Sequence, residues 1–356
     1  MNAQEEYNQS GGNIVWTLPL RENNRNWKSV ASSADGSKLV AVVDGGQIYT
    51  STDSGIKWIP RDIDRSWYSV ASSADGSKLV AVVINGNIYT STNSGENWIP
   101  HMIDKNRLWV SVASSADGNK LVAVENGGQI YTYNNSEKKW KPHMIDQDRL
   151  WESVASSADG SKLVAVEGGG KIYTYVESDK KWIERATESN RDWRSVASSA
   201  DGTKLVAVVN AGKIYTSDNS GKIWLPRESY QRWSSVASSA DGSKLVAAVD
   251  GGQIYTSMNS GENWIPNESN HRWFSVALSA DGSKLIAVFQ LSQIYIGNIN
   301  PPIVPAPKIP VEPPLLSISI MPSLVNNQEQ GKYLGGYKQK YLKYKQKYIQ
   351  LKNDIN

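Results

Sequence analysis

The chain has 356 residues with 14 tryptophans, 17 tyrosines and no cysteine, which excludes a disulfide scaffold and a thiolate metal site. Its net charge of +3 is unevenly distributed. Residues 328 to 356 hold seven lysines against Glu329 and Asp354, a net +5 that leaves the rest of the chain at about −2.

The first twelve residues contain neither a basic stretch nor an apolar core of the kind that forms a signal peptide. No run of about 18 apolar residues, the length of a membrane span, occurs along the sequence. We therefore predict that residues 1–12 are disordered and that the protein is soluble and cytoplasmic, without a signal peptide.

Residues 13–300 are dominated by a repeated block, W-x-S-V-A-x-S-A-D-G-x-K-L-x-A, which occurs seven times at spacings of 40 or 42 residues. The seven units begin at Trp27, Trp67, Trp109, Trp151, Trp193, Trp233 and Trp273. In the first unit, the pattern predicts strands over 27–33, 38–43, 47–51 and 57–60, separated by Asp-Gly turns. A period near 40 with four short strands predicts an all-β fold, a β-propeller of four-stranded antiparallel blades.

The last strand of each unit is marked by a second tryptophan, but the seventh unit lacks one. These tryptophans are Trp58, Trp98, Trp140, Trp182, Trp224 and Trp264. Residues 13–19, which contain Trp16, are similar to residues 57–60 and supply the missing strand. The sequence thus predicts a seven-bladed propeller whose ring is closed by the N-terminal strand, which protects the edges that an open ring would expose. Strand direction places the turns between second and third strands, and the loops joining units, on one face, here called the top face.

The turn from Ser51 to Trp58 has the pattern S-x-D-x-G-x-x-W. It resembles the Asp-box of the bacterial neuraminidase repeat, found in sialidases, some glucanases, sortilin-like receptors and Ycf48-like photosystem assembly factors, and the resemblance covers roughly residues 13–299. Asp53 corresponds to Asn93, Asn219 and Asn259 in other units, whereas the third and fourth units have lost the box. The resemblance implies that these four residues brace their turns rather than bind calcium or a ligand.

Two sets of residues are candidates for binding on the top face. The first set consists of an arginine just before each unit's first tryptophan and an acid five residues before it. The arginines are Arg25, Arg65, Arg107, Arg149, Arg191, Arg232 and Arg272, and the acids are Glu22, Asp62, Asp104, Asp146, Glu188, Glu228 and Glu268. A ring of guanidinium groups can grip carboxylates or phosphates. The alternative, favoured by the matched number of acids, is that each arginine pairs locally.

The second set occupies the post-tryptophan position, which follows the first tryptophan of each unit and differs among otherwise copied units. It comprises Lys28, Tyr68, Val110, Glu152, Arg194, Ser234 and Phe274. We expect these side chains near the mouth of the central channel, where their mixture of charge and aromatic rings is typical of a recognition surface. Neutral drift at a tolerant position is the alternative.

Catalysis and metal binding are not expected. His101 and His143 occur in the same P-H-M-I-D context, but repeat copying explains them and no third ligand is evident. A sialidase-like site needs three convergent arginines and a glucanase-like site needs two opposed carboxylates, yet Glu152 has no identifiable partner. We therefore predict no metal, no cofactor and no enzymatic activity.

The C-terminal part changes character. Residues 301–331 form a proline-rich linker, and residues 332–356 have apolar or tyrosine positions at heptad spacing, which predicts a short basic amphipathic helix. Three hypotheses compete for it: a homo-oligomeric coiled coil, a docking helix and a solvated tail. The segment KYLKYKQKYIQLK also resembles tails of giant DNA virus proteins, which implies a location in the host cytoplasm or the virion.

These observations favour a non-catalytic propeller scaffold that binds a macromolecular partner, foremost a protein, through its top face and channel mouth. The alternatives are a carbohydrate-binding or glycan-cleaving sialidase-like propeller, and a Ycf48-like assembly factor or virion structural protein. Nucleic acid is not an expected partner, because the lysines are concentrated in the tail.

Overall fold

The computed structural model describes residues 6–7, 14–17, 24–144, 146–185, 189–228 and 230–299. These residues form antiparallel β-sheets and no helix. The described part of the chain therefore contains no helix that could cross a membrane. The predicted linker over 301–331, and the helix and oligomer contacts predicted over 332–356, lie outside the described residues.

The strands follow the repeat along the chain. Before the first unit come β1 (Glu6–Tyr7) and β2 (Ile14–Thr17). The first two units contain β3 (Trp27–Ser32), β4 (Leu39–Ser51), β5 (Ile59–Ser72), β6 (Leu79–Gly86), β7 (Ile88–Ser91) and β8 (Ile99–His101). The third and fourth contain β9 (Arg107–Ser114), β10 (Lys120–Gly128), β11 (Ile130–Asn134), β12 (Lys139–His143), β13 (Arg149–Ser156), β14 (Lys162–Gly170), β15 (Ile172–Val176) and β16 (Lys181–Arg185). The last three contain β17 (Arg191–Ser198), β18 (Leu205–Val209), β19 (Ile214–Ser217), β20 (Leu225–Pro226), β21 (Trp233–Ser238), β22 (Leu245–Ser257), β23 (Ile265–Leu278), β24 (Lys284–Phe289) and β25 (Ile294–Ile299).

Some strands are longer than the sequence predicts. The strands expected over 38–43 and 47–51 are one continuous β4, and the strand expected over 57–60 runs into the next unit as β5. The reason is an extra pairing, in which Asp44 lies opposite Ser66 and Gly46 opposite Arg65. The turn of one unit is thereby bonded to the loop that enters the next unit, so both lie on the same face.

The N-terminal segment adds a strand to the sheet of the seventh unit. β2 pairs antiparallel with β25, with Ile14 opposite Ile299 and Thr17 opposite Ile296. The approach is close, because a Cβ on Gly297 would lie 2.6 Å from the Ile14 side chain. On its other side β2 pairs with β1, inside the segment 1–12 that the sequence predicts to be disordered.

The buried tryptophan of β2 takes part in the core of its neighbours. Trp16 stacks on Trp273 with ring centroids 6.0 Å apart and meets Tyr295 edge-on at 5.9 Å. It belongs to a hydrophobic cluster that also includes Val246 and Ile254 of the sixth unit. Aromatic pairs of this geometry add to the stabilisation that burial provides.

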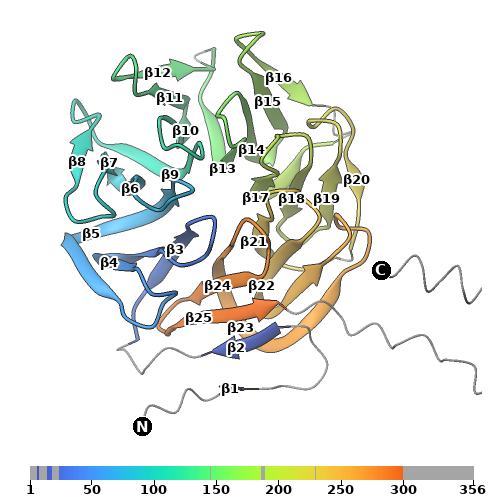
Figure 1. The fold of residues 1–356 in the computed structure, drawn as a ribbon. Helices are drawn as coiled ribbons and strands as arrows, with labels where there is room; N and C mark the ends of the chain where they lie inside the picture. The colour runs from blue at the N-terminus through green and yellow to red at the C-terminus, as the bar shows by residue number, and fades with distance from the viewer. Residues whose placement is uncertain are drawn as a thin grey trace, which may run out of the picture. The chain divides into compact units, whose positions relative to one another are not determined.

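Figure 1 shows the sheets of consecutive units side by side. The hydrophobic core lies between these sheets rather than within one of them. In one cluster, Val42 and Ile48 of the first unit pack against Trp67 of the second. Another cluster combines Trp27 of the first unit with Val288 of the seventh. Each unit is therefore stabilised by both of its neighbours, and the first and the last units are neighbours.

Two series of hydrogen bonds also join the units. In the first series, the alanine before each Asp-Gly turn donates its N–H to the corresponding carbonyl of the next unit, and Ala280 donates to Ala34 at 2.7 Å. In the second, a valine N–H donates to the hydroxyl oxygen of the serine after the post-tryptophan residue of the preceding unit, as Val70 does to Ser29 and Val30 to Ser275, both at 3.3 Å. Both series return to the unit where they begin.

The Asp-Gly turns are stabilised by their own side chains. In the first, Ser33 donates a hydrogen bond to Asp35 at 2.6 Å, the Ser37 N–H donates to the same carboxylate, and Gly36 has a φ of 68°. Only a residue tolerant of positive φ fits that corner. The hydrogen bond from Ser33 is the largest cause of a pKa of Asp35 well below its usual range.

Candidate functional site

The seven post-tryptophan residues line a single cavity of about 370 Å³, here called the mouth cavity. They come from seven different units: Lys28, Tyr68, Val110, Glu152, Arg194, Ser234 and Phe274. The structure thus brings together residues that lie up to 246 positions apart in the sequence.

A β-bulge explains why this position faces the cavity. In the first unit, Trp27 lies opposite Val43 and Ser29 opposite Val42, so that Lys28 between them has no partner. The same register shift occurs in all seven units at the post-tryptophan residue. Bulges redirect a side chain out of the regular alternation and are frequent next to functional sites. The bulge frees this residue from pairing and leaves it open to variation.

One side of the mouth cavity is aromatic and cationic. The Lys28 ammonium lies 4.6 Å from the ring centre of Phe274 and 5.3 Å from that of Tyr68. Burial raises the pKa of the Tyr68 hydroxyl, with the Glu152 carboxylate adding to the rise. The phenol therefore keeps its proton at neutral pH and can donate a hydrogen bond.

The other side holds an ion pair. Arg194 donates to Glu152 at 2.9 Å, and the two side chains keep 44% and 21% of their surface exposed. Burial raises the pKa of Glu152, and Arg194 opposes that rise. In the sixth unit, Asp250 bonds Arg232 at 2.8 Å and Arg272 at 3.2 Å.

The wall of the cavity below the post-tryptophan residues is polar. It contains the serines that accept the valine N–H groups, at positions 29, 69, 111, 153, 195, 235 and 275. Accepting a hydrogen bond leaves each hydroxyl with its own hydrogen to donate. The mouth cavity therefore combines a ring of donors with a rim of charged and aromatic side chains.

The predicted arginine ring is engaged in local contacts. Arg107 and Arg149 are 6% exposed and bond Asp104 and Asp146 at 2.7 Å, while Arg65 lies 3.5 Å from Asp62. Arg25 and Arg191 donate to the hydroxyls of Tyr49 and Tyr215, both at 2.9 Å. Arg232 and Arg272 both bond Asp250. Glu22, Glu188 and the side chain of Glu268 lie outside the described part of the chain.

The arginine contacts also include stacking on aromatic rings. The guanidinium of Arg107 lies 5.9 Å from the ring centre of Trp109 and 5.5 Å from that of Tyr131. Hydrogen bonding to Asp104 holds the pKa of Arg107 above its usual value. The guanidinium groups that contact rings are thus part of the packing between strands, namely those of Arg25, Arg65, Arg107, Arg149 and Arg191. Arg232 and Arg272 remain largely exposed.

The four predicted Asp-box residues bond within their turns. Asp53 accepts hydrogen bonds from the Ser51 hydroxyl at 2.8 Å and from the Lys57 N–H at 2.9 Å. The counterparts Asn93, Asn219 and Asn259 accept the same two kinds of bond. In all four residues the Oδ1 atom is occupied by the turn itself.

The two copied histidines lie in separate junctions. His101 Nε2 is 2.8 Å from the Thr90 hydroxyl, and His143 Nε2 is 2.7 Å from that of Thr132. Burial lowers the pKa of both imidazoles, so they are neutral at pH 7. Among the residues that the structure describes, no group of three or more histidine, aspartate and glutamate side chains could hold a metal ion.

No model of a known protein family matches the sequence, and no curated protein matches it either. Solved structures do match. YCF48 from Cyanidioschyzon merolae superposes with a TM-score of 0.65 at 16% identity, over 80% of this chain and 98% of that one. A second structure, YCF48 bound to D1 peptide, gives a TM-score of 0.64 at 16% identity, over 83% of this chain and all of that one. The chain has a β-propeller fold. At this level of identity the likeness concerns the fold alone.

Proposed function

We propose that the chain is a seven-bladed β-propeller closed by β2, and that it serves as a non-catalytic scaffold which binds a segment of a protein partner at the mouth cavity. The observation that carries this proposal is the convergence of all seven post-tryptophan residues on one cavity. The units are near copies of one another but differ at this position, and the seven residues at this position lie on the same surface. Such variation is expected if that surface has been specialised for recognition.

The architecture is supported by contacts between the first and the last units. Ala280 bonds Ala34, Val30 bonds Ser275, and Trp27 packs with Val288. The pairing of β2 with β25 gives the seventh unit its fourth strand. A closed ring keeps the mouth cavity preformed, which lowers the entropic cost of binding a partner.

The side chains of the mouth cavity suit a peptide. Tyr68 and Phe274 offer apolar surface, Lys28 between them offers a cation, and the Glu152–Arg194 pair offers both charges on the other side. Aromatic and arginine anchors are enriched at the centre of protein interfaces. A protein of similar fold has been captured with a peptide, which supports the same class of partner here.

The absence of catalysis is part of the proposal. Each of the two carboxylates that line the mouth cavity is paired with arginine: Glu152 with Arg194, and Asp250 with Arg232 and Arg272. A glycoside-cleaving pair needs one carboxyl group that protonates the leaving oxygen and a second that acts opposite to it. We expect no turnover of a panel of fluorogenic glycosides, and hydrolysis that is lost in Glu152→Gln would overturn this part.

The binding proposal can be tested with peptides selected by the full chain from a random display library. A triple variant, Tyr68→Ser, Arg194→Ser and Phe274→Ser, should bind the selected peptides at least tenfold more weakly, because it removes the aromatic and arginine anchors of the cavity. Its Tm, measured beside that of the parent, separates a loss of affinity from a loss of folding.

The matched control replaces exposed residues in the turns that precede the last strands of the first and fifth units, in Ile56→Ser, Lys57→Ser and Ile223→Ser. Its affinity should equal that of the parent. Equal affinity for parent and mouth variant, or the same loss in the control, would contradict the proposal.

A further inference from the structure

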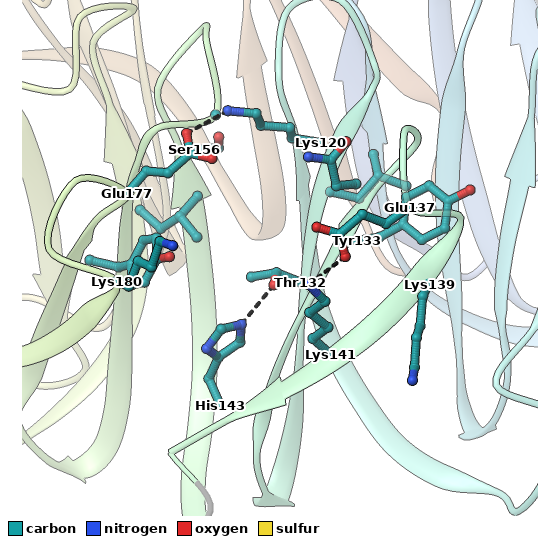
Figure 2. Close-up of a pocket in the computed structure, with 15 residues that line it drawn as sticks. Lys120, Thr132, Tyr133, Glu137, Lys139, Lys141, His143, Ser156, Glu177 and Lys180 are labelled. Carbon is teal, nitrogen blue, oxygen red and sulfur yellow. Dashed lines mark hydrogen bonds and ion pairs between the residues drawn. The ribbon is translucent and has the colours of Figure 1, made fainter.

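A second cavity, of about 390 Å³, lies between the third and fourth units and is here called the lysine groove. Figure 2 shows its lining, with the Lys120–Glu177 pair at one end and His143 bonded to Thr132 near the other. None of the residues that line it also lines the mouth cavity. The groove is therefore a separate site.

The fourth unit, which forms one side of the groove, has lost its box turn. Where the box is present, its glycine covers the threonine of the preceding unit, so that a Cβ on Gly95 would lie 2.8 Å from the Thr50 methyl and one on Gly221 would lie 2.8 Å from that of Thr174. The cavities at those two junctions measure only about 10 Å³. The junction of the fifth and sixth units keeps a glycine over Thr216 and has a cavity of about 240 Å³.

Aromatic rings have taken the place of the box. The position of the box serine is occupied by Tyr133 in the third unit and Tyr175 in the fourth. Tyr175 lies against His143 of the preceding unit, with ring centres 5.9 Å apart. At the position of this histidine the first, fourth, fifth and sixth units carry Arg61, Arg185, Arg227 and Asn267. At this junction, tyrosine thus stands in place of the box serine, and histidine stands in place of the arginine or asparagine of those units.

The charge of the lining is unbalanced. Lys120 bonds Glu177 at 2.6 Å, and Lys141 pairs with Glu137. Lys139 and Lys180 also line the groove, are exposed, and make no ion pair with any residue that the structure describes. Four lysines against two glutamates leave the lining with two uncompensated positive charges.

We propose that the lysine groove binds an acidic peptide segment of a protein partner. Two carboxylates of the segment contact Lys139 and Lys180, and an apolar or aromatic side chain packs against Tyr133 or Tyr175. Ammonium groups bind carboxylates by charge-assisted hydrogen bonds, and tyrosine supplies contact area at low entropic cost. The proposal is independent of what binds at the mouth cavity.

Charge argues against two other occupants. A nucleic acid carries a continuous row of phosphates, which the Glu137 and Glu177 carboxylates at the groove repel, whereas a peptide can space its acids to avoid them. The chain's own segment 328–356 is excluded by its seven lysines, which the uncompensated positive charge of the groove repels. An external acidic peptide is the occupant that matches both features.

The first test locates binding by acylation of lysines on the full chain, read by mass spectrometry. Hexaglutamate should slow the acylation of Lys139 and Lys180 at least threefold, and hexaserine should not. Lys57 and Lys222 are the controls, because they occupy the equivalent turn positions in units that keep the box and are also exposed. Equal protection at all four lysines, or at none, would overturn the proposal.

The second test measures the affinity of fluorescein-labelled hexaglutamate by anisotropy. The variant Lys139→Glu/Lys180→Glu should bind at least tenfold more weakly than Lys57→Glu/Lys222→Glu, which has the same net charge. Both variants carry the lysine-rich segment 328–356, and its binding enters the fit of both curves as a common second site. Equal affinities of the two variants for hexaglutamate would refute binding in the groove. A heparin hexasaccharide or single-stranded DNA that binds more tightly than hexaglutamate, and loses that affinity in Lys139→Glu/Lys180→Glu, would refute the peptide as ligand.

Discussion

The substitution Trp16→Ala tests whether the N-terminal strand is an integral part of the propeller. Trp16 of β2 and Trp58 at the end of the first unit occupy equivalent positions and retain 7% and 6% of their surface exposed. Burying about 200 Å² of tryptophan at about 25 cal/mol per Å² gives an upper limit of about 5 kcal/mol. Replacing a buried tryptophan by alanine costs about 3–5 kcal/mol, so we expect a loss of about 4 kcal/mol for either variant.

The assay is equilibrium unfolding in urea, followed by the circular dichroism of the sheet because removal of a tryptophan changes the fluorescence. Trp58→Ala serves as the matched control, since its strand belongs to the first unit's own sequence. If β2 closes the ring, both substitutions lower the free energy of unfolding by similar amounts. A loss of less than about 1 kcal/mol for Trp16→Ala, beside the full loss for Trp58→Ala, would show that β2 is not bound in solution.

Two further predictions concern the turns and the arginines. The hydrogen bonds from Ser157 and Ser161 lower the pKa of Asp159 to about 2, and Asp201 and Asp281 behave alike. The folded state holds these pKa values below their usual range, so the stabilisation is complete above about pH 4 and is lost as the pH falls towards 2. The Tm should therefore drop between pH 4 and pH 2.5. An unchanged Tm over that interval would contradict this prediction. The substitution Arg107→Ala should cost about 1–2 kcal/mol of stability, through lost hydrogen bonds and stacking on Trp109 and Tyr131, and should leave peptide affinity at the mouth cavity unchanged. Loss of affinity without loss of stability would show instead that this arginine binds the partner.

Much of the fold follows from the repeat. The spacing of the tryptophans predicts the sheets, and the likeness of residues 13–19 to residues 57–60 predicts the place of β2. The extended strands β4 and β5 could not be foreseen, because the pairing of Asp44 with Ser66 depends on how two units approach each other. Local pattern describes one unit and says little about contacts between units.

The candidate site shows the same division. Variation at the post-tryptophan position marks its residues, but the bulge that points them into the mouth cavity is a matter of strand register, which sequence spacing does not determine. The sharing of Asp250 by Arg232 and Arg272 was not predictable, since Asp250 lies opposite Arg272 only through the extra pairing of β22 with β23. The lysine groove did have a signal, namely the loss of the box in two consecutive units.

The most direct measurement of the central proposal places a photoreactive benzoylphenylalanine at position 234, inside the mouth cavity, or at position 223, on an exposed turn outside it. Each variant is irradiated with a peptide selected by the unmodified full chain, and the crosslinked product is measured by mass spectrometry. Binding at the mouth cavity predicts a crosslink from position 234 and none from position 223. A crosslink from position 223 alone would show that the partner binds elsewhere.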